Sequence, residues 1–272
     1  MTTHVSRRSL LALGAGLGAS LGASTLFGGS ALARAAKVGT QSPYFHRFML
    51  GAAEVTVVSD GPLPLGPPKG TFTGASDDEI KNMLVDNFLA PDNIVLEQNS
   101  PIVNMGDKLV LFDTGMGSSQ AFGPTTGRQQ KSMAEAGIKP EDIDAVVFSH
   151  AHIDHIGGVV DGSGKVLFPN AQFYIAQSDF DYWTDEGKLG SPLKDFVVHA
   201  RKNLMPIRDK LVFYKDGQEF LPGVQALAAP GHTVGHTIFM VTSDGKSFAF
   251  LADLTHHPVS YTHLTLPTIL RV

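Results

Sequence analysis

The sequence His150-Ala151-His152-Ile153-Asp154-His155 places three histidines and one aspartate within six residues. It follows residues 145–149, an apolar run with β-branched members that is typical of a buried strand. Side chains two positions apart on an extended chain face the same side, so His150 and His152 can both reach one point beyond the strand end. Imidazole nitrogen and carboxylate oxygen are ligands that zinc accepts, and the chain has no cysteine to supply a thiolate. This stretch therefore predicts a metal site.

Two later segments offer further ligands. Residues 230–237 hold His232 in a glycine-flanked turn before a predicted strand, and residues 250–253 end another predicted strand in Asp253. A carboxylate has two oxygens and is suited to bridge two ions. We therefore expect His232 and Asp253 to join the histidine cluster.

Strand and helix patterns alternate between residues 36 and 258. Residues 55–59 and 102–105 are predicted strands. Residues 77–89 carry apolar side chains, Phe88 among them, at helical spacing, with Ser76 as the N-cap. Residues 62–68 are rich in proline and glycine and are predicted to form a loop. The alternation predicts an α/β fold with its layers around one core.

The composition, 43% hydrophobic and 17% charged over 272 residues, is typical of a globular protein and excludes collagen-like, coiled-coil and wholly disordered chains. This length forms one large domain or two small ones. The absence of cysteine excludes a disulfide framework, a thiolate metal site and a cysteine nucleophile. With 26 acidic and 21 basic residues, a net charge of −5, we expect no nucleic-acid partner.

The N-terminal segment has the features of an export signal. Arg7 and Arg8 precede a short apolar run interrupted by glycines at residues 10–27, and small residues follow at 31–35. We expect residues 1–35 to be a signal peptide that resembles the twin-arginine type, without a stable membrane anchor. The mature protein is then periplasmic or secreted.

The last residues are interpreted as foreign to the protein. Residues 259–268 match, codon by codon, the in-frame translation of a transposon adapter used in sequencing libraries; a genuine β-rich tail is the alternative. We expect residues 259–272 to be a sequencing-adapter artefact and the natural chain to continue beyond Pro258. His263 therefore receives no functional role.

The motif H-x-H-x-D-H, followed by a lone histidine and then an aspartate, resembles the signature of the metallo-β-lactamase superfamily. Residues 112–115, 122–125 and 230–237 resemble its methyl-parathion-hydrolase-like branch. The resemblance spans residues 45–257. It implies a four-layer αββα sandwich over residues 36–258, with the C-terminal part missing.

The resemblance also implies a centre of two divalent metal ions. Its ligands would be His150, His152 and His232 for the first metal, Asp154 and His155 for the second, and Asp253 as the bridge between them. In the family a final histidine for the second metal comes from a downstream segment that this chain lacks, so the second set is one ligand short. Zinc is the default metal, although manganese, cobalt or iron can occupy nitrogen and oxygen sites.

Further polar residues are expected beside the ligands. His236 is expected to support them from behind or to pack on the strand, and His256 and His257 to line the pocket without binding metal. Asp113, in an Asp-Thr-Gly turn, is expected to orient a metal-bound histidine, with a simple turn-forming role as the alternative.

The implied activity is hydrolysis, in which a metal-bound hydroxide attacks an ester, lactone or organophosphate triester bond. Asp154 would orient the nucleophile or handle a proton. Phe122, Trp183 and Phe196 fall where the branch has aromatic side chains around its leaving-group pocket, which favours a small apolar or aryl substrate; core packing is the alternative. A homodimer is left open.

Other functions remain as alternatives. One is an exported protein that binds metal without catalysis, and another is a β-lactamase or lactonase of the same fold. An iron-based oxygen or nitric-oxide reductase would show glutamate in place of His152. A nuclease of the superfamily would need a basic surface and an added domain.

Overall fold

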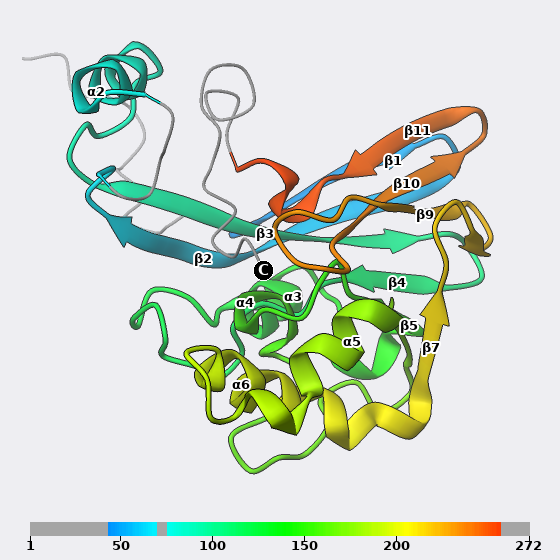
Figure 1. Ribbon diagram of the computed structural model, residues 1–272. Helices are drawn as coiled ribbons and strands as arrows, with labels where there is room; N and C mark the ends of the chain where they lie inside the picture. The colour runs from blue at the N-terminus through cyan, green and yellow to red at the C-terminus, as the bar shows by residue number, and fades with distance from the viewer. Residues whose placement is uncertain (1–42, 70–74, 257–272) are drawn as a thin grey trace, which may run out of the picture. The chain divides into compact units, whose positions relative to one another are not determined.

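The computed structural model describes residues 43–69 and 75–256, which belong to one compact unit of the chain (Figure 1). The strands are β1 (Phe45–Leu50), β2 (Ala53–Gly66), β3 (Ile94–Asn104), β4 (Leu109–Phe112), β5 (Ala145–Val147), β6 (Gln172–Ala176), β7 (Leu211–Tyr214), β8 (Glu219–Leu221), β9 (Val224–Ala228), β10 (Thr237–Ser243) and β11 (Lys246–Phe250). The helices are α2 (Asp77–Asp86), α3 (Gln129–Glu135), α4 (Ile153–Ile156), α5 (Gln177–Thr184) and α6 (Lys194–Leu204), with 3-10 turns η1 (Pro140–Asp142), η2 (Glu186–Lys188), η3 (Met205–Lys210) and η4 (Ala252–Leu254).

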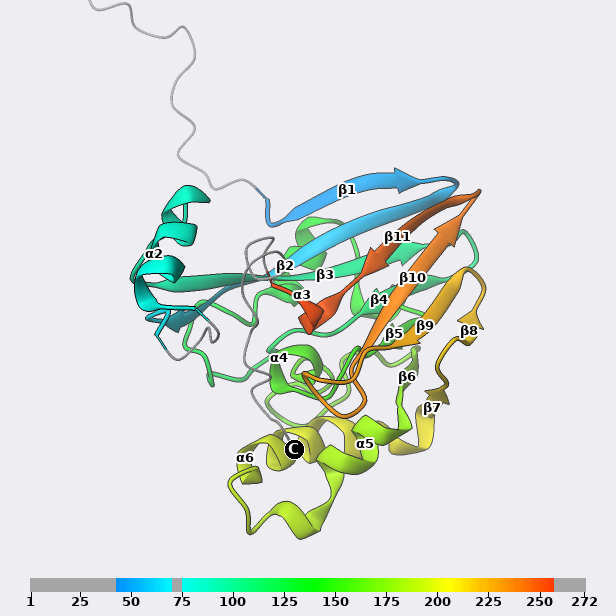
Figure 2. The same ribbon diagram turned by 45° about the horizontal axis from the view of Figure 1, so that its top comes forward.

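The strands form two sheets. Strands β1 to β7 lie in chain order in one sheet, which is antiparallel from β1 to β4 and parallel from β4 to β7. Strands β8 to β11 form a smaller antiparallel sheet in the order β11-β10-β9-β8. The two views show the smaller sheet over one face of the large sheet, and α4, α5 and α6 on the opposite face (Figures 1 and 2).

Two apolar cores hold these layers together. Between the sheets, the ring of Phe112 lies 5.5 Å from that of Phe239 on β10. Along β5, Ala145 and Val147 enter this inter-sheet core, whereas Val146 faces the core beneath the helices. Because a strand that is buried on both faces has no polar side, the run reads as continuously apolar in the sequence.

The α/β sandwich expected from the sequence is confirmed. Within the described ranges, no α-helix packs on the outer face of the four-stranded sheet, so this part of the chain supplies three of the four expected layers. The same part contains no helix that is both long and apolar enough to span a membrane. The predicted signal peptide and the predicted adapter segment lie outside the described residues.

The predicted loop at residues 62–68 is wrong over its first five positions, because β2 continues as a strand to Gly66. Within the part of the chain that the structure describes, β1 pairs with β2 as far as Val58, and no strand lies on that side of β2 beyond this point. Proline is tolerated on an edge strand because its missing N–H removes no bond of the ladder. Pairing with β3 continues, with register shifts between Ser59 and Gly61 and between Pro64 and Gly66.

The predicted helix at residues 77–89 is confirmed at its start and is wrong at its end. Ser76 and Glu79 form a reciprocal capping box at the N-terminus of α2. The helix ends at Asp86, where the side-chain amide of Asn87 donates a hydrogen bond from Nδ2 to the Met83 carbonyl at 2.8 Å. Phe88 then takes a left-handed φ of 61°, and its side chain is 99% exposed rather than on the apolar face.

Candidate metal centre

The candidate ligands gather at one edge of the sandwich because of strand direction. Parallel strands bring their carboxyl ends to the same edge of a sheet, and there Asp113 follows β4 and His150 follows β5. From the smaller sheet, the turn between β9 and β10 carries His232, and η4 after β11 carries Asp253. Ligands more than one hundred residues apart in sequence therefore meet at this edge.

The first ligand set consists of three histidines. Nε2 of His232 lies 3.2 Å from Nε2 of His150 and 3.0 Å from Nδ1 of His152. Ligands held about 2.0–2.1 Å from one tetrahedral zinc would be about 3.3 Å apart, close to these separations. The three converging nitrogens therefore suit one divalent ion.

The second set lies against the first. Nε2 of His155 is 3.1 Å from Oδ1 of Asp253 and 3.4 Å from Oδ2 of Asp154. The other oxygen of Asp253, Oδ2, lies 3.2 Å from Nε2 of His232. One carboxylate thus faces both sets, and the structure brings all six predicted ligands together.

The electrostatics of both sets suit cations. Burial lowers the pKa of His152 to about 4 and that of His232 to about 3, so both rings are neutral at pH 7 and offer lone pairs. Burial also opposes a charge on His155, but the carboxylates of Asp253, Asp154 and Asp113 around it raise its pKa well above the ordinary value. The second set concentrates negative charge that a metal ion can balance.

Two predicted supporting residues lie behind the ligands. Oδ2 of Asp113 is 2.8 Å from Nδ1 of His155. Both nitrogens of His236 face the backbone, with Nδ1 3.2 Å from the Ala229 carbonyl and Nε2 accepting the Asp253 N–H at 3.2 Å. His236 is therefore placed to hold Asp253 rather than to bind a metal.

His256 contacts one of the candidate ligands. Its Nε2 is 3.1 Å from Oδ2 of Asp253, the oxygen that also faces His232. His257 lies outside the described residues.

The comparison with known families agrees with this geometry. A family model for the metallo-beta-lactamase superfamily matches residues 94–262, more than half of the chain. The chain belongs to this superfamily. The branch suggested by the sequence stays a prediction.

Several relatives of this superfamily member are lactonases or hydrolases. AidC, a dizinc quorum-quenching lactonase solved with a product, is 33% identical with a TM-score of 0.72, covering 78% of this chain and 75% of that one. The N-acyl homoserine lactonase of Bacillus cereus is 25% identical over 61% of this chain and 67% of its own. The metallo-hydrolase mfmC of Annulohypoxylon moriforme is 28% identical over 58% of this chain, which spans about half of that relative's length.

Gln98 contacts one of the candidate ligands and was not predicted from the sequence. Gln98 on β3 donates from Nε2 to Oδ2 of Asp154 at 3.0 Å. Its partner lies 56 positions further along the chain, so no local sequence pattern around Gln98 indicates the contact. Only the packing of β3 beside α4 reveals the contact.

A cavity of about 360 Å³ opens onto the second ligand set, and we call it the site cavity. Apolar side chains of β2, β3 and β11 line one part of it, and ligand residues line the other. The lining residues that bear on function are Leu63, Leu96, Gln98, Phe250, Asp253 and His256. The cavity therefore joins an apolar wall to the candidate metals.

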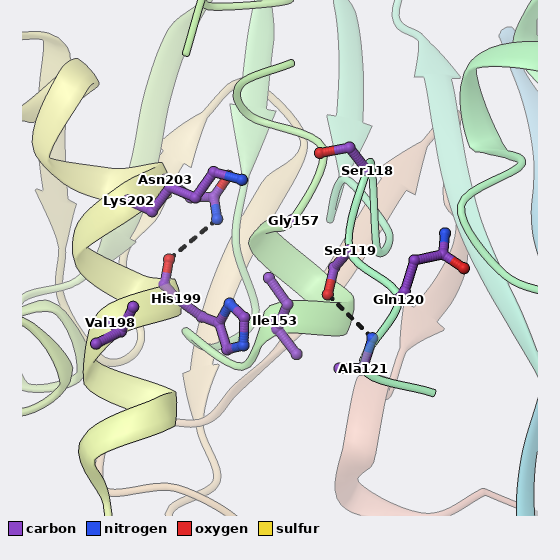
Figure 3. Close-up of a pocket in the computed structure, with 10 residues that line it drawn as sticks. All are labelled: Ser118, Ser119, Gln120, Ala121, Ile153, Gly157, Val198, His199, Lys202 and Asn203. Carbon is purple, nitrogen blue, oxygen red and sulfur yellow. Dashed lines mark hydrogen bonds between the residues drawn. The ribbon is translucent and has the colours of Figure 1, made fainter. Parts of the chain in front are cut away.

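A second cavity, of about 320 Å³, lies between the loop at residues 118–121 and helix α6 (Figure 3). His199 points from α6 toward Ile153. Ile153 lies within residues 150–155, between two of the candidate ligands, but is not itself a ligand. None of the six candidate ligands lines this cavity. Of these two cavities, only the site cavity borders the candidate metal centre.

The three predicted pocket aromatics lie away from the site cavity. Trp183 and Phe196 pack against the ring of His152, with centroids 5.1 and 5.2 Å from it. Trp183 is fully buried, so it supports His152 and offers no surface to a substrate. Phe122 is partly buried and follows Ala121, a lining residue of the second cavity. A pocket role for Phe122 and Phe196 stays a prediction.

Proposed function

We propose that this protein is a metal-dependent hydrolase that opens lactone or carboxylic ester bonds of small, partly apolar substrates. The observation that carries the proposal is the position of Asp253, whose two oxygens face the two ligand sets at 3.1 and 3.2 Å. That arrangement suits a pair of ions sharing one carboxylate. The lactonases among its relatives support the substrate class.

The residues fit two divalent ions, with zinc as the expected metal. The first would be held by the three-histidine set and the second by Asp154 and His155, with Asp253 shared. When bound, such ions supply Lewis-acid polarisation of a carbonyl and activation of water near neutral pH.

The protein's own residues then orient the reaction. Gln98 holds Oδ2 of Asp154 at the cavity wall, so this carboxylate is fixed where it can accept a proton from the attacking water. Leu63 and Leu96 are direct partners across β2 and β3 and both line the cavity. Their side chains form an apolar surface for the acyl part of a substrate, with the scissile bond toward Asp253.

The proposal is tested with a panel of substrates on the zinc-loaded protein. The panel contains N-acyl homoserine lactones of increasing acyl length, aryl carboxylic esters and aryl phosphotriesters. We expect turnover of lactones or esters, its loss on treatment with a chelator and its recovery when zinc is added back.

Two results would contradict the proposal. Stoichiometric zinc without turnover of any substrate would favour a metal-binding protein that is not an enzyme. Faster turnover of phosphotriesters than of lactones and esters would reassign the substrate class.

A further inference from the structure

Asp179 is a fully buried carboxylate that no part of the proposed mechanism uses. It lies in the first turn of α5, directly after β6. Its Oδ2 accepts the backbone N–H of Ala151 at 2.6 Å, and its Oδ1 accepts the backbone N–H of Gly235 at 2.9 Å. Each oxygen thus holds a different segment of the chain.

Both segments carry metal ligands. Ala151 stands between His150 and His152, and Gly235 stands in the turn that carries His232. The two segments are separated by about eighty residues in sequence. Asp179 therefore links, through one side chain, the two loops that must meet to form the three-histidine set.

The packing at Gly235 supports the same link independently. A Cβ atom added there would lie only 2.7 Å from both Cβ and the backbone N of Asp179, and 2.7 Å from Oγ of Ser178. Real side chains do not tolerate such distances, so the turn can rest against α5 only because residue 235 is glycine.

Helix α5 also contacts a ligand directly. Trp183, one turn beyond Asp179, is fully buried with its ring 5.1 Å from that of His152. The start of α5 thus holds the backbone of both loops, and its later turn supports one of the imidazoles.

We propose that Asp179 is a positioning residue that sets the separation of the two ligand loops, so that His150, His152 and His232 converge before a metal arrives. The inference rests on the proposed function in that it requires a metal at this set. Without the carboxylate, two buried N–H groups lose their acceptor and the loops can separate. Metal binding must then order them, which lowers the affinity.

The test is Asp179→Asn in the full chain, with zinc affinity measured by competition against a chromophoric chelator. The amide keeps the size of the side chain but replaces one acceptor oxygen with a donor. We expect zinc affinity to fall by about 10- to 100-fold. The visible absorption of the cobalt(II)-loaded protein should change as well, because the ligand geometry is altered.

Asp60→Asn is the matched control. Asp60 is also fully buried, and it accepts three backbone N–H bonds at 3.0 Å from Met116, Gly127 and Gln129, none of which is a ligand. Its substitution should destabilise the fold in a similar way and leave zinc affinity little changed. Equal loss of affinity in both variants would overturn the inference, because the effect would then be general destabilisation.

Gly235→Ala provides a second variant if Asp179→Asn does not fold. It keeps the carboxylate but pushes the His232 turn away from α5, and it should also weaken zinc binding. Unchanged affinity in the folded variants would overturn the inference and leave the proposed function standing. A wild-type protein that binds no zinc would overturn both.

Discussion

Oδ2 of Asp113 lies 2.8 Å from Nδ1 of His155, while the same carboxylate accepts the N–H of Ser149 at 2.8 Å and its hydroxyl at 2.7 Å. Asp113 itself has a φ of 57°, a conformation that costs free energy in a non-glycine residue. The strained turn aims the carboxylate at His155, so that the opposite nitrogen, Nε2, faces Asp253. Such a partner fixes the tautomer and the ring orientation of a metal-binding histidine.

Substituting Asp113 with asparagine should weaken metal binding at the second set. The amide cannot accept from both His155 and Ser149 as the carboxylate does, so the ring loses its fixed orientation. We expect about 10- to 100-fold lower zinc affinity or activity, measured by chelator competition and by steady-state kinetics. Asp144→Asn, which affects an exposed carboxylate bonded to the Leu109 N–H, is the control. Equal effects of the two substitutions would contradict the prediction.

Removing a ligand should abolish hydrolysis. His150→Ala and Asp253→Ala should each lower kcat/KM at least about a thousandfold, equivalent to about 4 kcal/mol of transition-state stabilisation. His199→Ala removes a histidine of the second cavity instead and should leave kcat/KM near the wild-type value. Near-wild-type rates in both ligand variants would exclude this site as the catalytic centre.

Filling the apolar part of the site cavity should change which acyl-chain lengths the protein prefers in its lactone substrates. Leu96→Trp should lower kcat/KM for long-acyl lactones more than for short-acyl ones, because the larger ring occupies the cavity beside Leu63. Val95→Trp is the control, since the neighbouring Val95 is 44% exposed and does not line the cavity. The measurement is the ratio of kcat/KM values across acyl lengths. A ratio that does not change would place the acyl chain elsewhere.

The metal-free protein should lose stability in acid through its buried histidines. Burial lowers the pKa of His152 to about 4 and that of His232 to about 3 in the folded protein, against an ordinary value of 6.5. Between the folded pKa of each ring and 6.5, the unfolded chain therefore binds more protons than the folded protein does. Stability therefore rises with pH in this window, by at most about 1.4 kcal/mol per pH unit for each histidine. His155 behaves in the opposite way. Burial opposes its protonation, but the carboxylates around it raise its pKa, so the stability that protonated His155 contributes to the fold is lost only as pH rises above 6.5.

Urea unfolding in the presence of a chelator measures this effect. The curve of stability against pH for His232→Ala should be flatter than that of the wild type between pH 4 and pH 6. His46→Ala, on exposed β1, serves as the control variant. Parallel curves for the wild type and His232→Ala would show that His232 is not buried as a neutral ring.

The candidate ligands and the fold class were predicted from local sequence features and from the family signature that these features form. His150 lies three residues after the end of β5, and Asp253 lies in η4, three residues after the end of β11, so neighbouring residues dictate which side chains follow each strand. The apolar run of β5 and the capping box at Ser76 are local features of the same kind. Such features can be predicted because few distant contacts compete with them.

Other features depended on the tertiary structure. Gln98 reaches Asp154, and Asp179 joins the two ligand loops, only because segments distant in sequence are neighbours in space. The strand at 62–66 exists because β3 pairs with it, although its prolines favour a loop. Trp183 was predicted to line the pocket because it is aromatic, yet packing buries it behind His152. The sequence alone determined which groups can bind metal, whereas long-range packing decided which residues position those groups and where the cavity opens.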